Sequence, residues 1–354
     1  MRKILKKMKD EKGSITSVVL VTVLFFIIIL STALMISGTQ RKSQLDSEIT
    51  LKQVYQNQVD DAEKISKSLV VVKAPIPDGY YYVGGTDESG VVISDNIADK
   101  DRYSGEENVG KDLEGNQWVW VPVENPSSLY TTVTDGIALS GSTGVKTTKY
   151  TNSEIISGKK RGLPGSTNFS SLANMAENMK SDYEEMIASL EKYKGFYIGR
   201  YELTANGEKT GATQTDIDWY TLYKNCTTLA VGSKVKTRMI WGLQWDATCN
   251  WLASSGFNIK DSSTWGNYYN NTATGHGTKQ NTGYSESWKA NNIYDFAGNC
   301  FEFTQEANNT SYRAFRGGGY RDNGSSYPAS DRSYDSPTSS GSFYSSRPTL
   351  YLIP

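Results

Sequence analysis

Histidine and cysteine are scarce in this chain. Its 354 residues include one histidine, His276, and three cysteines, Cys226, Cys249 and Cys300, which lie far apart and form no CxxC pair. A zinc site or a histidine-based nucleophilic triad needs more imidazole groups than the chain contains. Three separated cysteines allow one disulfide at most, so a disulfide-stapled domain is excluded as well. We interpret His276, in a Gly-His-Gly loop, as a solvated residue.

The chain also has almost no net charge and few prolines. The formal net charge is −1 at pH 7 and only 9 residues are proline, so the overall charge does not indicate a nucleic-acid partner. Tyrosine and glycine, in contrast, are abundant, with 23 and 32 residues. This composition is typical of an irregular, turn-rich fold with aromatic packing and argues against a disordered chain.

One long apolar run lies near the N-terminus. Ile15–Ile36 contains only Ser and Thr as polar residues, and about 20 residues suffice to cross a bilayer as a helix. Six Lys and Arg residues precede it, which predicts a cytoplasmic N-terminus and an extracellular C-terminal domain. A cleaved signal peptide is the alternative, although the run exceeds a usual signal core and no A-x-A site follows. We predict a basic segment over 1–14 and a retained transmembrane helix over 15–38.

The junction before this run offers another interpretation. Lys12, Gly13 and Ser14 are similar to a prepilin-type leader, in which cleavage follows the glycine and the apolar segment becomes an assembly helix. Pilins usually carry Glu at the fifth position after the cut, where this chain has Val18. Cleavage after Gly13 and a pilin-like structural role therefore stand as an alternative.

A helical pattern follows the apolar run. Apolar residues recur at three- to four-residue steps over Ser43–Leu69, between charged and Gln-rich positions, and this spacing predicts a helix. Pro75 and Pro77 end the pattern. We predict a helical stalk over 39–72, with self-association through it as a weaker alternative, and one further domain over 73–354.

The remaining sequence mixes strand and helix signals. Short β-rich segments bounded by turn residues predict strands at Gly79–Gly85, Val91–Ser94, Gln117–Val123 and Gly195–Thr204. Helical periodicity predicts a helix over Leu172–Tyr193 and an amphipathic helix over Trp241–Leu252, with Trp245, Cys249 and Leu252 on one face. Residues 131–165 are poor in apolar side chains and predict an exposed excursion. Together these elements predict an α+β domain.

Six motifs occur in a fixed order within this domain: WVWVPV, FYIGRYELT, WDATCNWL, NIYDFAGNCFEF, RAFRGGGY and RPTLYL. As an ordered set they resemble the formylglycine-generating, sulfatase-modifying-factor family. The resemblance covers most of 78–354 and rests on the order and number of the motifs. It implies an irregular C-type-lectin-like fold that is poor in regular secondary structure.

The resemblance implies a calcium site within NIYDFAGNCFEF. The family's matching segment binds the ion through side-chain and backbone oxygens, and the positions that match are the carboxylates of Asp295 and Glu302 and the carbonyls of Gly298 and Cys300. A hard cation takes several oxygen ligands, and a turn that contains glycine lets carbonyls converge. The alternative is that both carboxylates cap turns. We predict a structural calcium ion.

The resemblance also implies a copper-binding cysteine pair downstream of the RGG motif, because soft thiolates suit Cu(I). No cysteine follows Arg316, Gly317 and Gly318 in this chain. We therefore expect no copper and no formylglycine-generating activity. An oxidoreductase of the sulfatase-modifying type is kept as an alternative function.

Residues 319–346 form a run of Ser, Tyr, Asp, Asn and Gly with almost no aliphatic side chain. It resembles the C-terminal variable region of diversity-generating retroelement targets, many of which use the same lectin-related fold. In those systems AAY codons are randomised at their adenines, and Asn, Ser, Asp, Tyr, Gly and Phe are all reachable by that route. The relatives' closing motif usually reads GFR, whereas this chain has Ser345, Ser346 and Arg347.

Such a surface is suited to recognition. Tyrosine offers a large, rigid contact area, and Ser, Gly and Asn supply adaptable hydrogen bonds. We therefore predict a single-pass, membrane-anchored extracellular protein that recognises a protein or glycan ligand. The alternative is a plain solvated loop surface. The residues predicted to face the ligand are Tyr320, Asp322, Asn323, Tyr327, Asp331, Tyr334, Asp335, Phe343 and Tyr344.

Overall fold

The computed structural model describes residues 22–27, 52–60, 72–126, 172–307 and 312–354. The chain divides into two units, Met1–Val71 and Val72–Pro354. In the first unit, residues 22–27 and 52–60 are helical. The rest of the predicted transmembrane helix and stalk, the basic segment 1–14 and the excursion 131–165 lie outside the described residues. Within the described ranges, none of the helices combines the length and hydrophobicity that a membrane crossing requires.

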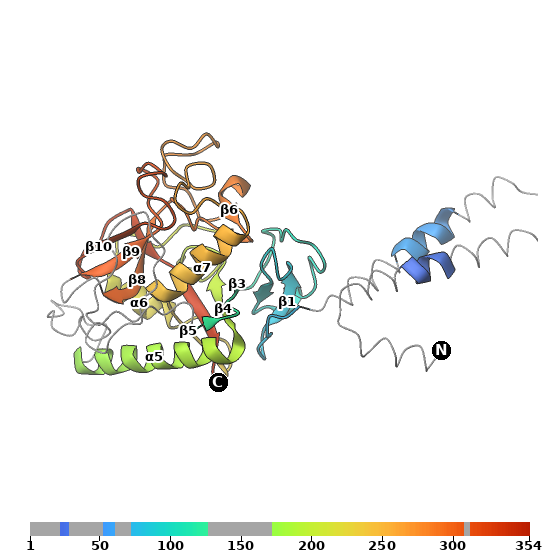
Figure 1. Cartoon of the computed structure of the whole chain (residues 1–354), viewed down its shortest axis with the longest axis horizontal. Helices are drawn as coiled ribbons and strands as arrows, with labels where there is room; N and C mark the ends of the chain where they lie inside the picture. The colour runs from blue at the N-terminus through green and yellow to red at the C-terminus, as the bar shows by residue number, and fades with distance from the viewer. Residues whose placement is uncertain (1–21, 28–51, 61–71, 127–171, 308–311) are drawn as a thin grey trace, which may run out of the picture. The chain divides into compact units, whose positions relative to one another are not determined.

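The second unit is built on a six-stranded antiparallel sheet in the order β1-β2-β3-β4-β12-β5 (Figure 1). Its strands are β1 (Tyr81–Gly84), β2 (Val92–Ser94), β3 (Gln117–Pro122), β4 (Gly195–Gly199), β12 (Pro348–Leu352) and β5 (Val235–Met239). Successive residues of a strand point to opposite faces. In β3, Val119 and Val121 accordingly join one buried cluster, while Trp118 and Trp120 join the other. Both faces of the sheet are therefore covered.

A second sheet runs in the order β10-β9-β8-β11. It contains β10 (Arg332–Asp335), β9 (Arg313–Arg316), β8 (Phe301–Ala307) and β11 (Tyr344–Ser346). β11 pairs in parallel with β8, and the chain then passes through Arg347 into β12 of the first sheet. A two-stranded ribbon of β6 (Lys289–Ala290) and β7 (Ile293–Tyr294) precedes β8. The C-terminal segment therefore connects the two sheets.

Within the described residues of the second unit, three α-helices and two 3₁₀ helices accompany the sheets. The α-helices are α5 (Leu172–Tyr193), α6 (Trp219–Cys226) and α7 (Gly242–Ser254), and the short helices are η1 (Ile97–Asp99) and η4 (Glu286–Trp288). Asp218 caps the N-terminus of α6, and its side chain accepts a hydrogen bond from the Thr221 backbone N–H. Figure 1 draws the loops that follow α7 at the end of this unit farthest from α5.

The sequence predictions for these elements are largely confirmed. The domain is α+β, the helix over Leu172–Tyr193 is present, and the predicted strands are found with shifted ends. The strand predicted over Gly195–Thr204 is wrong in its second half. β4 ends at Gly199, and the chain then turns back at Thr204 and Gly207, which exchange backbone hydrogen bonds of 3.2 Å.

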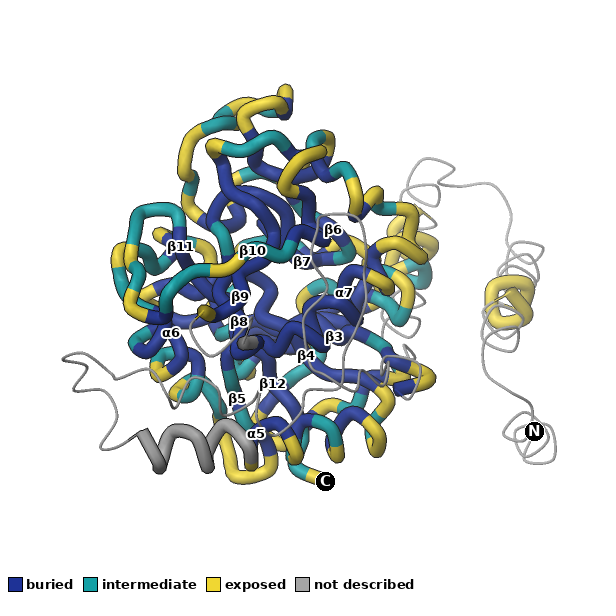
Figure 2. The backbone as a smooth tube through the Cα atoms, turned by 60° about the vertical axis from the view of Figure 1, so that its left-hand side comes forward, coloured by how far each residue is buried: buried dark blue, intermediate teal, exposed yellow. Residues whose placement is uncertain are grey.

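The amphipathic prediction for α7 is also wrong. Polar Gln244, Asp246 and Thr248 are buried together with Trp245 and Cys249. Figure 2 shows α7 among the dark blue, buried segments, whereas exposed backbone is concentrated in loops and on α5. Each polar side chain has a partner inside: Gln244 Oε1 accepts from the Trp241 N–H at 3.1 Å, and the Thr248 hydroxyl donates to the Gln244 carbonyl at 2.9 Å. The polar residues of α7 therefore form hydrogen bonds in the interior and do not form a solvent-exposed face.

Candidate functional site

The first half of the polar run, residues 319–330, is fastened to a loop far away in the sequence. The Gly324 N–H donates to Asn270 Oδ1 at 3.0 Å, and the Tyr269 N–H donates to the Asp322 carbonyl at 3.2 Å. The Ser262 N–H donates to the Gly324 carbonyl at 2.9 Å. These contacts give the loop a defined backbone although its side chains are small and polar.

The RGG motif sets the start of this loop. Gly318 has φ +72°, a left-handed conformation that favours glycine, and a Cβ there would lie 2.1 Å from the Tyr327 carbonyl oxygen. The Tyr268 hydroxyl donates to the Gly317 carbonyl at 2.6 Å. The glycines are thus required by the close approach of two backbones.

The second half of the run forms β10, and buried charges hold that strand. Arg332 pairs with Asp246 at 3.2 Å and with Glu306 at 3.1 Å, while Arg316 of β9 reaches the other oxygen of Asp246 at 2.8 Å. All four side chains are at most 7% exposed. Tyr334, two residues further along β10, is 54% exposed. One short strand therefore combines an anchored arginine and an exposed tyrosine.

An aromatic cluster lies beneath the run. The Phe301 ring packs on Phe315 at 4.7 Å and contacts Tyr327 and Tyr344 at 6.2 and 6.3 Å between centroids. Phe343 packs on Tyr344 at 4.5 Å. Because Phe301 touches residues from both ends of the run, β8 connects the loop half with the strand half.

The nine residues predicted to face a ligand occupy three environments. Tyr327 and Tyr334 are exposed, at 41% and 54%. Partly buried positions are Asp322, Asn323, Asp335 and Phe343. Tyr320, Asp331 and Tyr344 are buried, at 8%, 5% and 8% exposed.

The buried members have internal partners. The Tyr344 hydroxyl donates to Asp335 Oδ2 at 2.7 Å, and burial together with this carboxylate raises the pKa of Tyr344. Asp331 Oδ2 accepts from the Ser333 hydroxyl at 2.9 Å, and burial raises the pKa of Asp331. These buried side chains therefore support the exposed residues of the run and are not available to contact a ligand.

Two exposed tyrosines outside the run contact side chains within it, and the sequence did not indicate them. Tyr269 is 54% exposed, and its hydroxyl accepts from Asn323 Nδ2 at 3.4 Å. Tyr312 is 36% exposed, and its ring lies 5.4 Å from that of Tyr334. The tyrosine surface is defined here as Tyr269, Tyr312, Asn323, Tyr327 and Tyr334.

The predicted calcium segment follows β7 in a strained backbone. Asp295 and Gly298 have φ of +53° and +76°, and a Cβ at Gly298 would meet the Asn267 carbonyl oxygen at 2.3 Å. Asp295 Oδ2 accepts from the Thr282 hydroxyl at 3.0 Å and from the Gly283 N–H at 2.7 Å. Asp295 Oδ1 is buried without a hydrogen-bond partner.

The other predicted carboxylate is engaged by an arginine. Both oxygens of Glu302 accept from Arg347, at 2.6 to 3.2 Å, and both side chains are at most 1% exposed. The Cys300 sulfur is buried, and the Cys300 N–H donates to Glu202 Oε1 at 2.9 Å. The unpartnered oxygen of Asp295 fits a cation, whereas the Glu302 oxygens already have a cationic partner.

These residues belong to a group of four buried carboxyls around Arg347. Burial raises the pKa of Asp295 to about 6 and that of Glu302 to about 7. Burial, followed by the charges of Asp295 and Glu302, raises the pKa of Glu202, and burial also raises that of Glu208. Among the described side chains, no set of three or more His, Cys, Asp or Glu is arranged to hold a metal ion. Since backbone oxygens are central to the predicted site, calcium stays a prediction.

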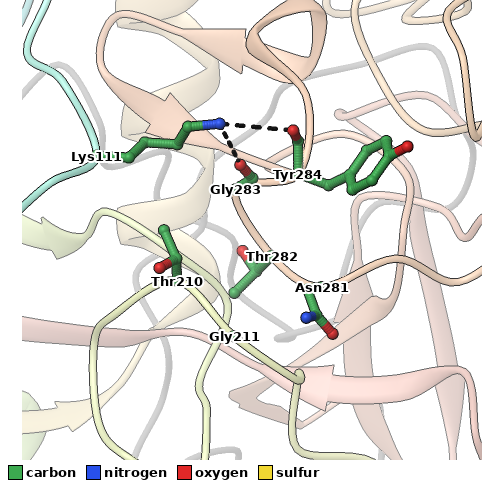
Figure 3. Close-up of a pocket in the computed structure, with 7 residues that line it drawn as sticks. All are labelled: Lys111, Thr210, Gly211, Asn281, Thr282, Gly283 and Tyr284. Carbon is green, nitrogen blue, oxygen red and sulfur yellow. Dashed lines mark hydrogen bonds between the residues drawn. The ribbon is translucent and has the colours of Figure 1, made fainter.

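A pocket of about 380 Å³ opens beside this segment (Figure 3). Lys111 lies at one wall and donates to the carbonyls of Gly283 and Tyr284 at 2.9 and 3.5 Å. Thr282 and Gly283 line the pocket and also donate to Asp295. The pocket and the predicted calcium segment therefore share these two residues.

No family model matches this chain, and no curated protein matches it. Among solved structures, Treponema denticola variable protein 1 is 16% identical, with a TM-score of 0.33 over 46% of this chain and 85% of that one. CarF is 13% identical, with a TM-score of 0.35 over 46% and 87%. PvdO from Pseudomonas aeruginosa is 17% identical, with a TM-score of 0.33 over 45% and 82%.

Proposed function

We propose that this chain is a membrane-anchored extracellular recognition protein, which binds a protein or glycan ligand through the tyrosine surface. The observation that supports this most directly is the division between anchored and exposed residues within one segment. Ala329 accepts a hydrogen bond from Trp245 Nε1 at 2.8 Å, while Tyr327, two residues earlier, is 41% exposed. In β10, likewise, Arg332 is held by buried carboxylates while Tyr334, two residues later, is exposed.

Such a segment can change its exposed side chains without losing the contacts that hold its backbone. Tyrosine supplies contact area at low entropic cost, and the neighbouring Asn and Ser side chains adapt their hydrogen bonds to different partners. The ordinary cost of an exposed substitution is within about 0.5 kcal/mol. This combination suits recognition better than catalysis, for which the segment offers neither a cysteine pair nor a histidine.

We further propose that the domain has the C-type-lectin-like fold of formylglycine-generating proteins and that the run 319–346 corresponds to a variable region. In support, each of the six motifs supplies a fully buried large side chain: Trp118, Tyr197, Trp245, Phe303, Arg316 and Arg347. The apolar N-terminal run would hold the domain at the membrane. Copper chemistry is not part of this proposal.

Changing the exposed tyrosines tests the recognition proposal. A chain with Tyr269, Tyr327 and Tyr334 all replaced by serine is expected to keep its melting temperature within a few degrees, because these rings are at least 41% exposed. Binding of the detergent-solubilised full chain to a glycan array and an extracellular-protein array is expected to disappear. Tyr284→Ser, which changes a ring 48% exposed outside this surface, is the control. Unfolding of the triple variant would make the surface structural and end the proposal.

Calcium is tested by thermal unfolding. We propose that Asp295, Glu302 and the carbonyls of Gly298 and Cys300 bind a structural calcium ion, so adding calcium to EDTA-treated protein should raise the melting temperature. Binding at 100 times the dissociation constant corresponds to about 2.7 kcal/mol.

Asp295→Asn is expected to abolish the calcium effect. Asp101→Asn is the matched control, because Asp101 also has a positive φ, +58° against +53° for Asp295, and asparagine tolerates that conformation. Identical melting of the wild-type chain in calcium, magnesium and EDTA would remove calcium from the account.

A further inference from the structure

A second pocket, of about 440 Å³, lies where α5, α6 and β5 meet. None of the tyrosine-surface residues lines it. Three basic side chains do so: Lys224 from α6, and Lys236 and Arg238 from β5. β5 is the last strand in the order of the six-stranded sheet, so these side chains gather at a sheet edge.

The strand period places two of the cations. Val235, Thr237 and Met239 of β5 are buried, whereas the alternating Lys236 and Arg238 are partly exposed on the opposite face. A hydrophobic strand face would have served packing equally well. The basic residues at these two positions are therefore not explained by the core.

Acidic residues of α5 hold both β5 cations in place. Arg238 Nε lies 2.6 Å from Asp182 Oδ2, and Lys236 Nζ contacts Glu185, one helical turn away. Asp182 is only 5% exposed and also accepts from the Tyr223 hydroxyl at 2.9 Å. The pairs fix the positions of the two basic heads at the pocket wall.

The ion pairs with Asp182 and Glu185 leave some N–H donors of these basic side chains without an acceptor in the described part of the chain. Within the described residues, the contacts of Arg238 engage Nε and Nη1, the latter with the Thr237 carbonyl at 2.8 Å, and leave the two N–H groups of Nη2. Lys236 has one acidic partner for an ammonium with three donors. Lys224 is exposed and makes no ion pair with another described residue. Asp182 and Glu185 therefore supply two negative charges against the three positive charges of Lys224, Lys236 and Arg238, which leaves the pocket with an excess of positive charge.

We propose that this pocket binds a small phosphorylated molecule, with Arg238 Nη2 and the ammonium groups of Lys224 and Lys236 donating to its phosphate. Charge-assisted hydrogen bonds to phosphate are about twice as strong as neutral ones, and a preorganised guanidinium loses little freedom on binding. The volume falls within the range of about 300–1,000 Å³ for small-molecule sites and exceeds what one phosphate ion fills. The hydroxyls of Ser181 and Thr227, which also line the pocket, suit a polar body such as a sugar.

Isothermal titration of the detergent-solubilised full chain tests the proposal, with inorganic phosphate, glucose 6-phosphate and glucose as probes. Glucose 6-phosphate is expected to bind saturably and more tightly than inorganic phosphate, and glucose not to bind. Lys224→Gln is expected to weaken binding about tenfold, and raising the salt concentration should weaken it further.

Lys260→Gln is the matched control, because Lys260 is exposed, lies outside the pocket and loses the same charge. Arg238→Lys provides a second variant, which keeps a cation beside Asp182 but removes Nη2, and its melting temperature reports whether the α5 contact survives. The proposal is overturned by an absence of saturable phosphate binding up to about 10 mM. Equal losses in the Lys224 and Lys260 variants would overturn it as well.

Discussion

Replacing Arg347 with methionine is expected to lower the free energy of unfolding by about 3–5 kcal/mol, because a buried carboxylate would lose its cationic partner. The guanidinium of Arg347 is fully buried and donates to both oxygens of Glu302. It also donates to the Gly199 carbonyl at 3.0 Å and the Tyr294 carbonyl at 2.9 Å. One side chain thus joins β4, β7 and β8 at the junction between the two sheets.

Equilibrium unfolding in urea measures this loss, with EDTA present so that calcium binding does not contribute. Arg321→Met is the control, since Arg321 is exposed and its guanidinium only lies over the Tyr320 ring, 5.1 Å from the centroid. Removing the carboxylate charge as well, in a Glu302→Gln and Arg347→Met double variant, should recover part of the loss.

The single Arg347 variant should also be less impaired at pH 5 than at pH 8, because protonation neutralises the stranded Glu302. A double variant no more stable than the single one, at either pH, would mean that the buried charge is not the cause. If the Arg347→Met variant were as stable as Arg321→Met, the Arg347–Glu302 ion pair would make no net contribution to stability.

The sequence predicts elements well where the pattern is local. Apolar spacing placed the α5 helix, and a short β-rich segment between turn residues placed β3, because both signals are contained in the element's own sequence. α7 could not be read in this way. Asp246 is buried because Arg316, 70 residues away, donates to it, and a local pattern contains no information about such a partner.

The candidate surface was recognised from composition but not in its extent. The run 319–346 is polar, yet Asp331 and Tyr344 are buried because side chains within the run satisfy them. Tyr269 reaches the surface through Asn323, 54 residues away. Tyr312, next to β9, contacts Tyr334 because β9 pairs with β10 in a register that brings the two rings together. Long-range pairing of this kind is set by the folded topology, which composition does not specify.

With EDTA present to remove calcium, the stability of this domain is expected to fall as pH rises from about 5 to 8, opposite to the trend of many proteins at the acidic end. The cause is the group of buried carboxyls around Arg347, whose pKa values are raised, to about 6 for Asp295 and about 7 for Glu302. A carboxyl with a raised pKa binds its proton more tightly in the folded state. Its stabilising contribution is complete below the unfolded pKa, near 4, and is lost as pH rises through the folded pKa.

For Glu302, the rise from 4.5 to about 7 corresponds to on the order of 3 kcal/mol. Glu286 acts in the opposite direction at lower pH. Its partial burial opposes ionisation, but hydrogen bonds from Lys289 and Tyr294 outweigh this and lower its pKa to about 2, so its contribution is lost as pH falls below about 4. Maximum stability is therefore expected between about pH 4 and 5.

Glu208→Gln isolates one member of the group. Burial raises the pKa of Glu208, its Oε1 has no hydrogen-bond partner, and its Oε2 accepts only a long bond of 3.4 Å from the Tyr201 N–H. Glutamine keeps the shape and cannot ionise, so the variant should be more stable than the wild type at pH 8 and nearly unchanged at pH 4.5. Urea unfolding across this range measures the difference, with the exposed Glu191→Gln as the control. A Glu208→Gln curve parallel to that of the wild type would show that Glu208 does not titrate between the two pH values, and the fall in stability would then have to come from Glu202, Asp295 and Glu302.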